Sequence, residues 1–216
     1  MPSVYVYAVS YDLGFAPNPF GGLCSLACCK PNIRDRANLG DWIVGLTGTK
    51  LKPTMRCVFA MQVATITTFD DYWSDAEFAS RKAKRNGSQK KQVGDNIYHR
   101  DGPDEPWIQE DSVHSLPGGD QCPLNTAHDT RVNRILLSDR FIYFGETAPA
   151  VPATILGKLD YQRNVRDYRK FDAPDAASLI AWVEGHMAKH SHRVLGDPFD
   201  FDSTSKRFSA TLQKLV

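Results

Sequence analysis

Two short segments combine the side-chain types that acid and base catalysis requires. The segment GDNIYH covers residues 94–99, and DSVHS covers residues 111–115. Together they place carboxylates, an amide, a phenol and two imidazoles on loops, where such groups exchange protons or hydrogen-bond to the edge of a nucleobase. We therefore predict Asp95 and His114 as general bases. The alternative is that these residues only form turns and solvated loops.

A cysteine nucleophile is the second chemical possibility. Cys24 directly follows a loop, residues 11–22, that is rich in Gly, Pro and Asn, and this position favours an exposed thiol. Such a nucleophile needs a histidine that the fold brings close to it, and sequence spacing does not test this. The alternative is a thiol packed in the core, where free cysteine is common.

Metal and cofactor chemistry is not favoured. Cys24, Cys28 and Cys29 do not form a CxxC pair, although thiolates and the histidines of the chain suit zinc. His186 and His190 are four residues apart, but the sequence GHMAKH lacks the glutamate of an HExxH zinc hydrolase motif. No Gly-rich phosphate loop or dinucleotide fingerprint is present. We predict no metal and no cofactor.

Basic and aromatic residues indicate a nucleic-acid or nucleotide partner. The phosphate contacts would come from Lys30, Arg34, Arg36, Lys50, Lys52 and Arg56. Aromatic side chains that could stack on an unpaired base are Phe20, Trp42, Tyr98 and Trp107. The alternative for the aromatics is the hydrophobic core. The loop of residues 80–91 adds six basic side chains and no acid, which indicates a solvated surface or a docking surface.

The whole chain is nearly neutral, so attraction to a polyanion must be local. It has 26 Lys and Arg against 25 Asp and Glu. Its 216 residues suit one domain, 1–216. The five cysteines lack a disulfide-like spacing, and no apolar run is long enough to span a membrane. We therefore expect a cytoplasmic protein without a membrane partner.

The elements that must position these residues alternate between strands and helices. The sequence predicts strands at residues 4–10, 23–29, 42–47, 57–69, 133–138 and 141–145. It predicts helices at residues 32–37, 70–85, from 172 through Met187, and 205–215. In the third of these, Leu179, Ile180 and Val183 recur at helical spacing, which indicates a buried stripe. Tight turns between neighbouring strands favour a mostly antiparallel sheet.

Several of these segments resemble a known family. The stretch YDLGFAPNPFGGLCSLACCKPNIRDRANLGDWIVG, then GDNIYH, DSVHS and ILLSDRFIYFG, is similar to the nucleotide modification associated domain family, type two, of bacteria and phages. The resemblance covers residues 4–150 and implies a role in DNA base modification. It implies these ligand-binding residues: Asp12, Asn18, Lys30, Arg34, Asp41, Trp42, Asn96 and Tyr98. The family pattern has one cysteine where this chain has Cys28 and Cys29.

A second resemblance concerns the fold. The short helix with arginine, the Gly-Asp-Trp entry into a strand and the strand FAMQVATI are similar to PUA-like barrels, including their EVE and ASCH relatives. This implies an α+β fold with a barrel-like, mostly antiparallel sheet, flanking helices and long functional loops. We expect a family-like core at residues 1–150 and a helical C-terminal extension, residues 151–216, packed on it.

Three functions agree with these patterns. In the first, the protein is a module that binds modified nucleotides or bases in nucleic acid. In the second, it is an enzyme that modifies a nucleotide or base with Asp95, His114 and Cys24. In the third, it is a scaffold in a modification or defence complex.

Overall fold

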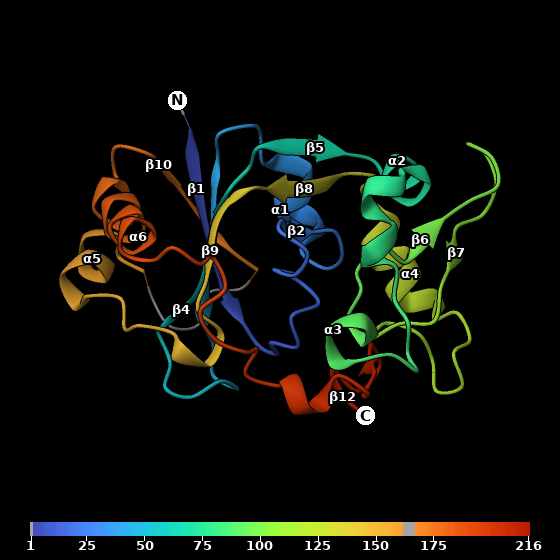
Figure 1. Ribbon diagram of the computed structural model, residues 1–216. Helices are drawn as coiled ribbons and strands as arrows, with labels where there is room; N and C mark the ends of the chain where they lie inside the picture. The colour runs from blue at the N-terminus through green and yellow to red at the C-terminus, as the bar shows by residue number, and fades with distance from the viewer. Residues whose placement is uncertain (1, 162–166) are drawn as a thin grey trace. The chain divides into compact units, whose positions relative to one another are not determined.

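The computed structural model describes residues 2–161 and 167–216, and Figure 1 shows their helices and strands. The chain forms two compact units, each built from three separate segments. Unit 1 consists of Met1–Asp12, Arg36–Thr65 and Ser138–Phe199, and unit 2 of Leu13–Asp35, Ile66–Leu137 and Asp200–Val216. Residues 151–216 contribute to both units, and the expectation of a single domain stays a prediction.

Unit 1 is organised around a five-stranded sheet with the order β10-β1-β3-β4-β9. Its strands are β1 (Ser3–Val9), β3 (Trp42–Thr47), β4 (Cys57–Gln62), β9 (Arg140–Tyr143) and β10 (Arg169–Asp172). β1 and β3 are parallel, and the other neighbours are antiparallel. This confirms an α+β protein with mostly antiparallel sheets. Because β10 and β9 lie at the two ends of the strand order and do not pair with each other, this sheet does not close. No sheet within the described residues forms a barrel, and the expected barrel is not confirmed.

Helices cover this sheet with apolar side chains. Unit 1 contains α5 (Ala153–Lys158), α6 (Ala177–Lys189) and the 3₁₀ helix η2 (Gly145–Thr147). Leu179 and Val183 of α6 are buried in one cluster with Val4, Val6 and Val44 of the sheet. Each such aliphatic side chain contributes about 1.5–3 kcal/mol when fully buried. The predicted apolar stripe is therefore part of the core.

Unit 2 consists mainly of short elements and loops (Figure 1). Its helices are α1 (Pro31–Arg36), α2 (Phe69–Ser74), α3 (Gln89–Gln92) and α4 (Pro123–Thr130), with the 3₁₀ helices η1 (Ala76–Arg81) and η3 (Phe201–Ser203). Its small sheets contain β2 (Cys24–Leu26), β8 (Ile135–Ser138) and β5 (Thr65–Thr67) in the order β2-β8-β5, then β6 (Tyr98–His99) with β7 (Ile108–Gln109), and β11 (Phe208–Ser209) with β12 (Lys214–Leu215). A core of Leu, Val and aromatic side chains, including Phe15 and Phe69, joins these pieces.

Two predicted long elements are interrupted. The strand expected at residues 57–69 is divided into β4 and β5. The helix expected at residues 70–85 ends at Ser74, and the Asp75 side chain then accepts a hydrogen bond from the Glu77 amide to begin η1. A side-chain acceptor of this kind favours a helix start over helix continuation.

The C-terminal segment also differs from expectation. Residues 205–215, predicted as a helix, contain β11 and β12 instead. The Phe208 amide donates to the Val113 carbonyl, and Arg207 exchanges backbone hydrogen bonds with Val216. Tertiary pairing thus replaces helical hydrogen bonds. No helix in the described part of the chain has the length and apolar character needed to cross a membrane.

Candidate active site

Cys29 lies in a strained turn between a strand and a helix of unit 2. β2 ends at Leu26 and α1 begins at Pro31, and the backbone between them is left-handed at Cys29 (φ 59°) and Lys30 (φ 41°). Left-handed backbone is costly for residues other than glycine, and it persists where surrounding contacts impose it. Strand-to-helix turns of this kind present nucleophiles in other enzyme folds.

Hydrogen bonds from two elements hold this turn. The Cys29 amide donates to Asp129 Oδ1 at 2.8 Å, and its carbonyl accepts from Arg34 Nε at 3.0 Å. Asp129 belongs to α4 and Arg34 to α1. The Cys29 side chain is half-buried, whereas the other four cysteines are buried. Of the five thiols, Cys29 is thus the one that is accessible to a substrate.

A histidine and a carboxylate are aligned behind the Cys29 sulfur. His114 Nε2 lies 3.6 Å from Cys29 Sγ. The other ring nitrogen, Nδ1, lies 2.7 Å from Asp129 Oδ2. A thiol, an imidazole and an orienting carboxylate in this order are the parts of a cysteine nucleophile with its base.

The loop that carries His114 is fixed by its neighbours. The His114 carbonyl accepts hydrogen bonds from Asn125 Nδ2 at 2.8 Å and from Gln109 Nε2 at 3.3 Å. The Phe15 ring packs against the imidazole at a centroid distance of 4.8 Å, and the Phe208 ring lies at 5.9 Å. The imidazole is therefore held between aromatic rings with one nitrogen toward the sulfur.

Asp129 is the fully buried anchor of the group. Its carboxylate also accepts from Tyr98 OH at 3.0 Å, and His128 Nδ1 lies 3.1 Å from it. Burial alone would raise the pKa of Asp129, but the charge and hydrogen bond of His114 hold that pKa well below its usual range. The carboxylate is therefore ionised at neutral pH.

The interaction that lowers the pKa of Asp129 raises the pKa of His114. Burial disfavours its protonated form, but the Asp129 carboxylate and the Cys29 sulfur raise the pKa of His114 to about 10. At neutral pH the ring is consequently an imidazolium that donates from both nitrogens. A thiol beside a protonated imidazole is the arrangement found at reactive cysteines.

The charge of His114 makes stability depend on pH. A raised folded-state pKa stabilises the protein below the unfolded value near 6.5, and this contribution is lost as pH rises toward 10. In this measurement every protein, including the wild-type reference, carries Cys29→Ala, so that only the imidazole titrates. We expect the free energy of unfolding to fall by about 1–2 kcal/mol between pH 6.5 and about pH 8. Urea unfolding at several pH values measures this slope.

His128→Asn is the matched control, because His128 contacts the same carboxylate from an exposed position. This variant should keep the slope, whereas His114→Asn should remove it. Equal slopes in the wild type and in His114→Asn would contradict the charged state of His114.

The predicted nucleophile and second base occupy buried positions. Cys24 is fully buried, and burial raises its pKa well above the usual range of a thiol. Asp95 is also fully buried, and it accepts hydrogen bonds from Tyr72 OH at 3.0 Å and from Ser25 Oγ, with Arg81 Nε at 3.5 Å. Burial raises the pKa of Asp95 despite these partners. Both residues lack access to solvent in the structure, and their catalytic roles stay predictions.

The other predicted ligand residues of unit 2 mostly support the backbone. Asn18 bridges the Val93 carbonyl and the Phe20 amide, and Asn96 donates to the Tyr72 carbonyl. Arg34 is buried and donates to four carbonyls, those of Cys29, Asp129, Val132 and Arg134. Tyr98 donates to Asp129, as described above. Lys30 is half-buried in the left-handed turn.

Three predicted ligand residues belong to unit 1, and all three are buried. Asp12 accepts hydrogen bonds from Tyr143 OH at 2.6 Å and from the Phe199 amide at 3.2 Å. Asp41 accepts from the amides of Ser3 and Asn38. The Arg140 guanidinium lies 5.5 Å from the centre of the Trp42 ring. These contacts explain each residue structurally, and a ligand role for them stays a prediction.

Sequence reasoning missed Cys29 and Asp129. In the sequence, Cys29 is one of two adjacent cysteines before Lys-Pro and one of three cysteines whose spacing does not favour zinc. Asp129 follows His128 on α4, and that short helix gave no periodic signal. The usable signal is a cysteine between a short apolar strand and a helix start, a position where nucleophiles are presented in other folds.

The same three side chains also form a possible metal site. One ligand atom from each of Cys29, His114 and Asp129 lies within 4.8 Å of the others. Sulfur, imidazole and carboxylate ligands suit zinc. Since His114 Nδ1 already contacts Asp129, an ion would bind Nε2 and the sulfur, with the carboxylate as a supporting acceptor.

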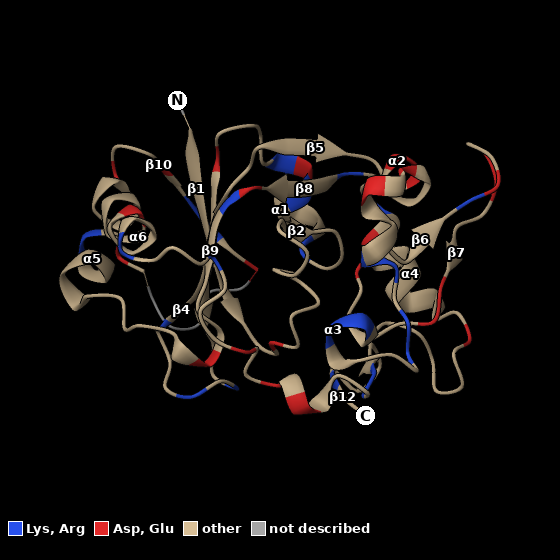
Figure 2. Ribbon diagram, viewed as in Figure 1, with Lys and Arg blue, Asp and Glu red and all other residues tan. Residues whose placement is uncertain are grey.

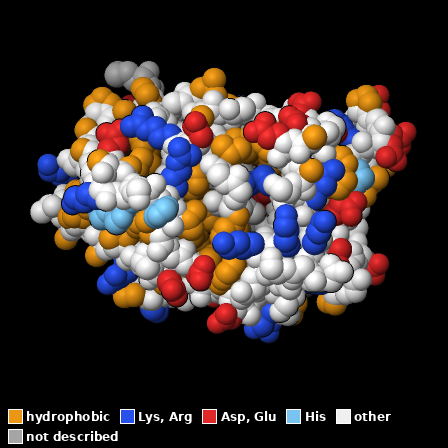
Figure 3. Space-filling view, in the orientation of Figure 1, with side chains coloured by type: hydrophobic (Ala, Val, Ile, Leu, Met, Phe, Trp, Pro, Cys, Tyr) orange, Lys and Arg blue, Asp and Glu red, His pale blue; other side chains and the backbone are white. Residues whose placement is uncertain are grey.

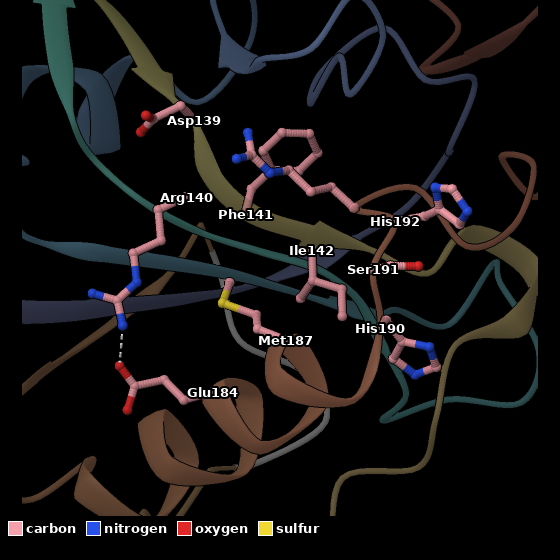
Figure 4. A pocket seen from close by; sticks show the side chains of 10 residues that line it. Asp139, Arg140, Phe141, Ile142, Glu184, Met187, His190, Ser191 and His192 are labelled. Carbon is pink, nitrogen blue, oxygen red and sulfur yellow. Dashed lines mark hydrogen bonds and ion pairs between the residues drawn. The ribbon is translucent and has the colours of Figure 1, made fainter.

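Unit 1 contains a separate pocket of about 340 Å³ beside β9 and the C-terminal end of α6. Figure 4 shows Ile142 and Met187 in its interior, with the Arg140–Glu184 ion pair at one side. His190, Ser191 and His192 lie on the chain after α6. This lining presents charged groups and imidazoles but no cysteine. We therefore assign the reactive centre to Cys29 in unit 2.

Comparison with known proteins identifies the chain at the level of a family. The family model described as Nucleotide modification associated domain 2 matches residues 1–205. No curated protein and no solved structure matches.

Proposed function

The chain belongs to the nucleotide modification associated domain 2 family, and on this premise we propose that it is a cysteine-dependent enzyme that acts on a modified nucleotide or base. The observation that carries the proposal is the alignment of Cys29 Sγ, His114 and the buried Asp129 carboxylate. The half-buried sulfur faces the Nε2 of an imidazolium whose other nitrogen is fixed by Asp129, and cysteine nucleophiles are activated by such a partner.

The reaction class that suits this group is acyl transfer. The Cys29 sulfur attacks the carbonyl carbon of an amide or ester on the base, and an S–C bond forms. The protonated His114 gives its proton to the departing nitrogen or oxygen, so that the leaving group departs as a neutral amine or alcohol and a thioester remains.

The second half of the reaction restores the enzyme. Water, or an acceptor amine, attacks the thioester carbon while the neutral His114 takes a proton from it. The S–C bond breaks, the product leaves as an acid or an amide, and the free Cys29 sulfur faces the imidazolium again. Asp129 keeps the Nδ1 proton of His114 in place through both steps.

Two other functions use the same residues. A binding module for modified bases would use these polar groups only as hydrogen-bond partners. A metal-dependent enzyme would use the sulfur and the imidazole as ligands, for which the 4.8 Å grouping is the favouring observation. Whether Cys29 reacts with the ligand, only contacts it or binds a metal ion therefore distinguishes these functions.

The first test is selective alkylation. Iodoacetamide at pH 6 should label Cys29 and leave the four buried thiols unmodified in the folded protein, as peptide mass mapping would show. Cys29→Ala should abolish the labelling, and Cys28→Ala should preserve it. Uniformly slow labelling of all five cysteines at pH 6 would argue against an activated nucleophile.

The second test detects the covalent intermediate. Purified protein is incubated with nucleosides and nucleotides whose base carries an amide or ester, and its intact mass is followed. A mass increase on Cys29 that hydroxylamine removes supports acyl transfer. Binding without any mass change or turnover supports a reader, and zinc bound at one equivalent with loss of turnover on chelation supports the metal site.

A further inference from the structure

Unit 2 contains a pocket of about 210 Å³ that the proposed chemistry does not use. It is lined by Asn18, Phe20, Gly21, Ser80, Arg81, Lys90, Lys91 and Gly94. We call it the lysine pocket. None of these eight residues is acidic, so the pocket presents cations without a neighbouring carboxylate in its lining.

The surroundings of the lysine pocket are strongly basic. Residues 80–91 contain six basic side chains and no acid. Figure 2 shows the positive residues of α3, and Figure 3 shows Lys and Arg side chains gathered in the region of α3. Because the chain as a whole is nearly neutral, this is a local field, and local fields attract anions to the place where they are strongest.

Lys90 and Lys91 differ from Arg81 in the hydrogen bonds that they make within the protein. The hydrogen bonds of Arg81 go to Tyr72 OH, Ser25 Oγ and backbone carbonyls, so that it supports the wall. Lys91 Nζ makes one hydrogen bond, to the Ser80 carbonyl at 3.1 Å, and an ammonium has three donors. Lys90 is exposed, with Nζ 5.4 Å from the centre of the Phe20 ring. Lys90 and Lys91 can therefore both donate to an anion.

An apolar wall limits what kind of anion fits. The half-buried Phe20 ring lies beside Lys90. The centre of the Phe20 ring is 5.8 Å from the centre of the Phe201 ring. At ~30 Å³ per water molecule, the pocket has room for about seven waters, which suits a phosphate with its sugar and leaves a base outside. Cationic side chains beside an aromatic ring are a recurring combination in the binding of single-stranded nucleic acid.

The lysine pocket is connected to Cys29 through buried contacts. Asn18 pairs with Ser25 of β2 by two backbone hydrogen bonds, and Ser25 is four residues before Cys29. An extended chain of four residues spans at most about 13 Å. Cys28 directly precedes Cys29, and its sulfur lies 3.6 Å from the Asp95 carbonyl oxygen. Asp95 directly follows Gly94, which lines the pocket. The wall of the pocket and the turn at Cys29 therefore belong to one packed region of unit 2.

We propose that the lysine pocket anchors the phosphate of the nucleotide on which the protein acts. The identity of this nucleotide as the substrate rests on the proposed function, whereas phosphate binding by the pocket does not. Lys90 and Lys91 contact the phosphate, and Phe20 packs on the sugar. The phosphate can come from a free nucleotide or from one nucleotide of a single strand, and both sources have the same chemistry.

Binding measurements test the pocket. Titration calorimetry compares a nucleoside, its 5′-monophosphate and a short single-stranded oligonucleotide on the full chain. The double variant Lys90→Gln with Lys91→Gln should weaken binding of the phosphorylated ligands on the order of 10-fold and reduce the salt dependence, and leave nucleoside binding unchanged. Inorganic phosphate should compete with the monophosphate.

The matched control removes two other exposed lysines, Lys158→Gln with Lys189→Gln, from helices α5 and α6 of unit 1. It should leave affinity unchanged. Tighter, more salt-sensitive binding of the oligonucleotide identifies a strand as the source, and equal affinities identify a free nucleotide. Either result upholds the pocket. Unchanged affinity in the Lys90 and Lys91 variant, or a loss in the control instead, overturns it.

The test of phosphate binding and the test of catalysis can fail independently of each other. Cys29→Ala should bind the monophosphate as tightly as the wild type, because the thiol is not part of the pocket. If Cys29 is labelled at pH 6 but no phosphorylated ligand binds, the pocket proposal fails alone. If the monophosphate binds but no adduct or turnover occurs, the catalytic proposal fails alone.

Discussion

Replacing Asp129 by asparagine is expected to slow the alkylation of Cys29 at pH 6 by about 100-fold. A protonated imidazole next to a cysteine sulfur makes that sulfur more reactive toward alkylating agents. The imidazolium depends on Asp129, because burial alone would lower the pKa of His114. Without the carboxylate the ring becomes neutral, and the sulfur loses its charged partner.

Turnover of a substrate should fall further than alkylation does. An asparagine amide can donate to His114 Nδ1 and hold the ring in the wrong tautomer, and a change of this kind costs about 10⁴-fold in the serine protease triad. The measurement is the second-order rate of iodoacetamide labelling between pH 5 and pH 9, with turnover where a substrate is known. Labelling should recover at high pH, where any thiol ionises.

Asp120→Asn is the control, since this carboxylate is exposed in the same unit. It should label like the wild type. His114→Gln provides a second route, because it removes the imidazolium without altering the carboxylate that holds the Cys29 amide. If both Asp129→Asn and His114→Gln label at the wild-type rate at pH 6 while folded, the three residues do not act as a catalytic group.

Replacing Arg34 by methionine should lower the free energy of unfolding by about 3–5 kcal/mol. The Arg34 side chain is completely buried, and its guanidinium donates to the carbonyls of Cys29, Asp129, Val132 and Arg134. Methionine fills similar space but leaves these carbonyls without their donor, and each unsatisfied buried group costs about 1–3 kcal/mol. Burial lowers the pKa of Arg34, and Asp129 offsets this. The guanidinium charge therefore matters for Asp129 as well.

The comparison variant is Arg131→Met. Arg131 is exposed and donates to the Asn32 side chain at 2.7 Å, so its loss should cost about 0.5 kcal/mol or less. Urea unfolding measures both variants. A stable Arg34→Met protein that has lost nucleotide binding would instead support the phosphate role that the sequence predicted for Arg34.

The fold was partly predictable because several elements carry strong local signals. β1, β3 and β9 are rich in β-branched and aromatic residues, and the structure has strands at those places. The stripe at Leu179 and Val183 of α6 is buried as its spacing predicts. β10 (Arg169–Asp172) was not predicted, because its polar residues become a strand only through pairing with β1.

The candidate site was less predictable than the fold. His114 could be chosen from its residue type, since histidine is the commonest general base. Asp95 could be chosen on the same ground, but the structure gives that carboxylate the buried partners Tyr72, Ser25 and Arg81. Residue type says which chemistry a side chain can do. Burial and neighbours decide whether it can reach a substrate.

The amino-acid sequence by itself determined the family, the α+β class with mostly antiparallel pairing, and His114 as a candidate. Only the tertiary structure decided which cysteine His114 faces. Cys24, Cys28 and Cys29 lie within six residues, and no local rule separates them. Cys29 is distinguished from the other two cysteines by its left-handed turn and by Asp129. Asp129 is 100 residues farther along the chain and binds both the Cys29 amide and the His114 ring. Contacts over such distances form only when the chain folds, because they depend on packing that sequence spacing does not encode.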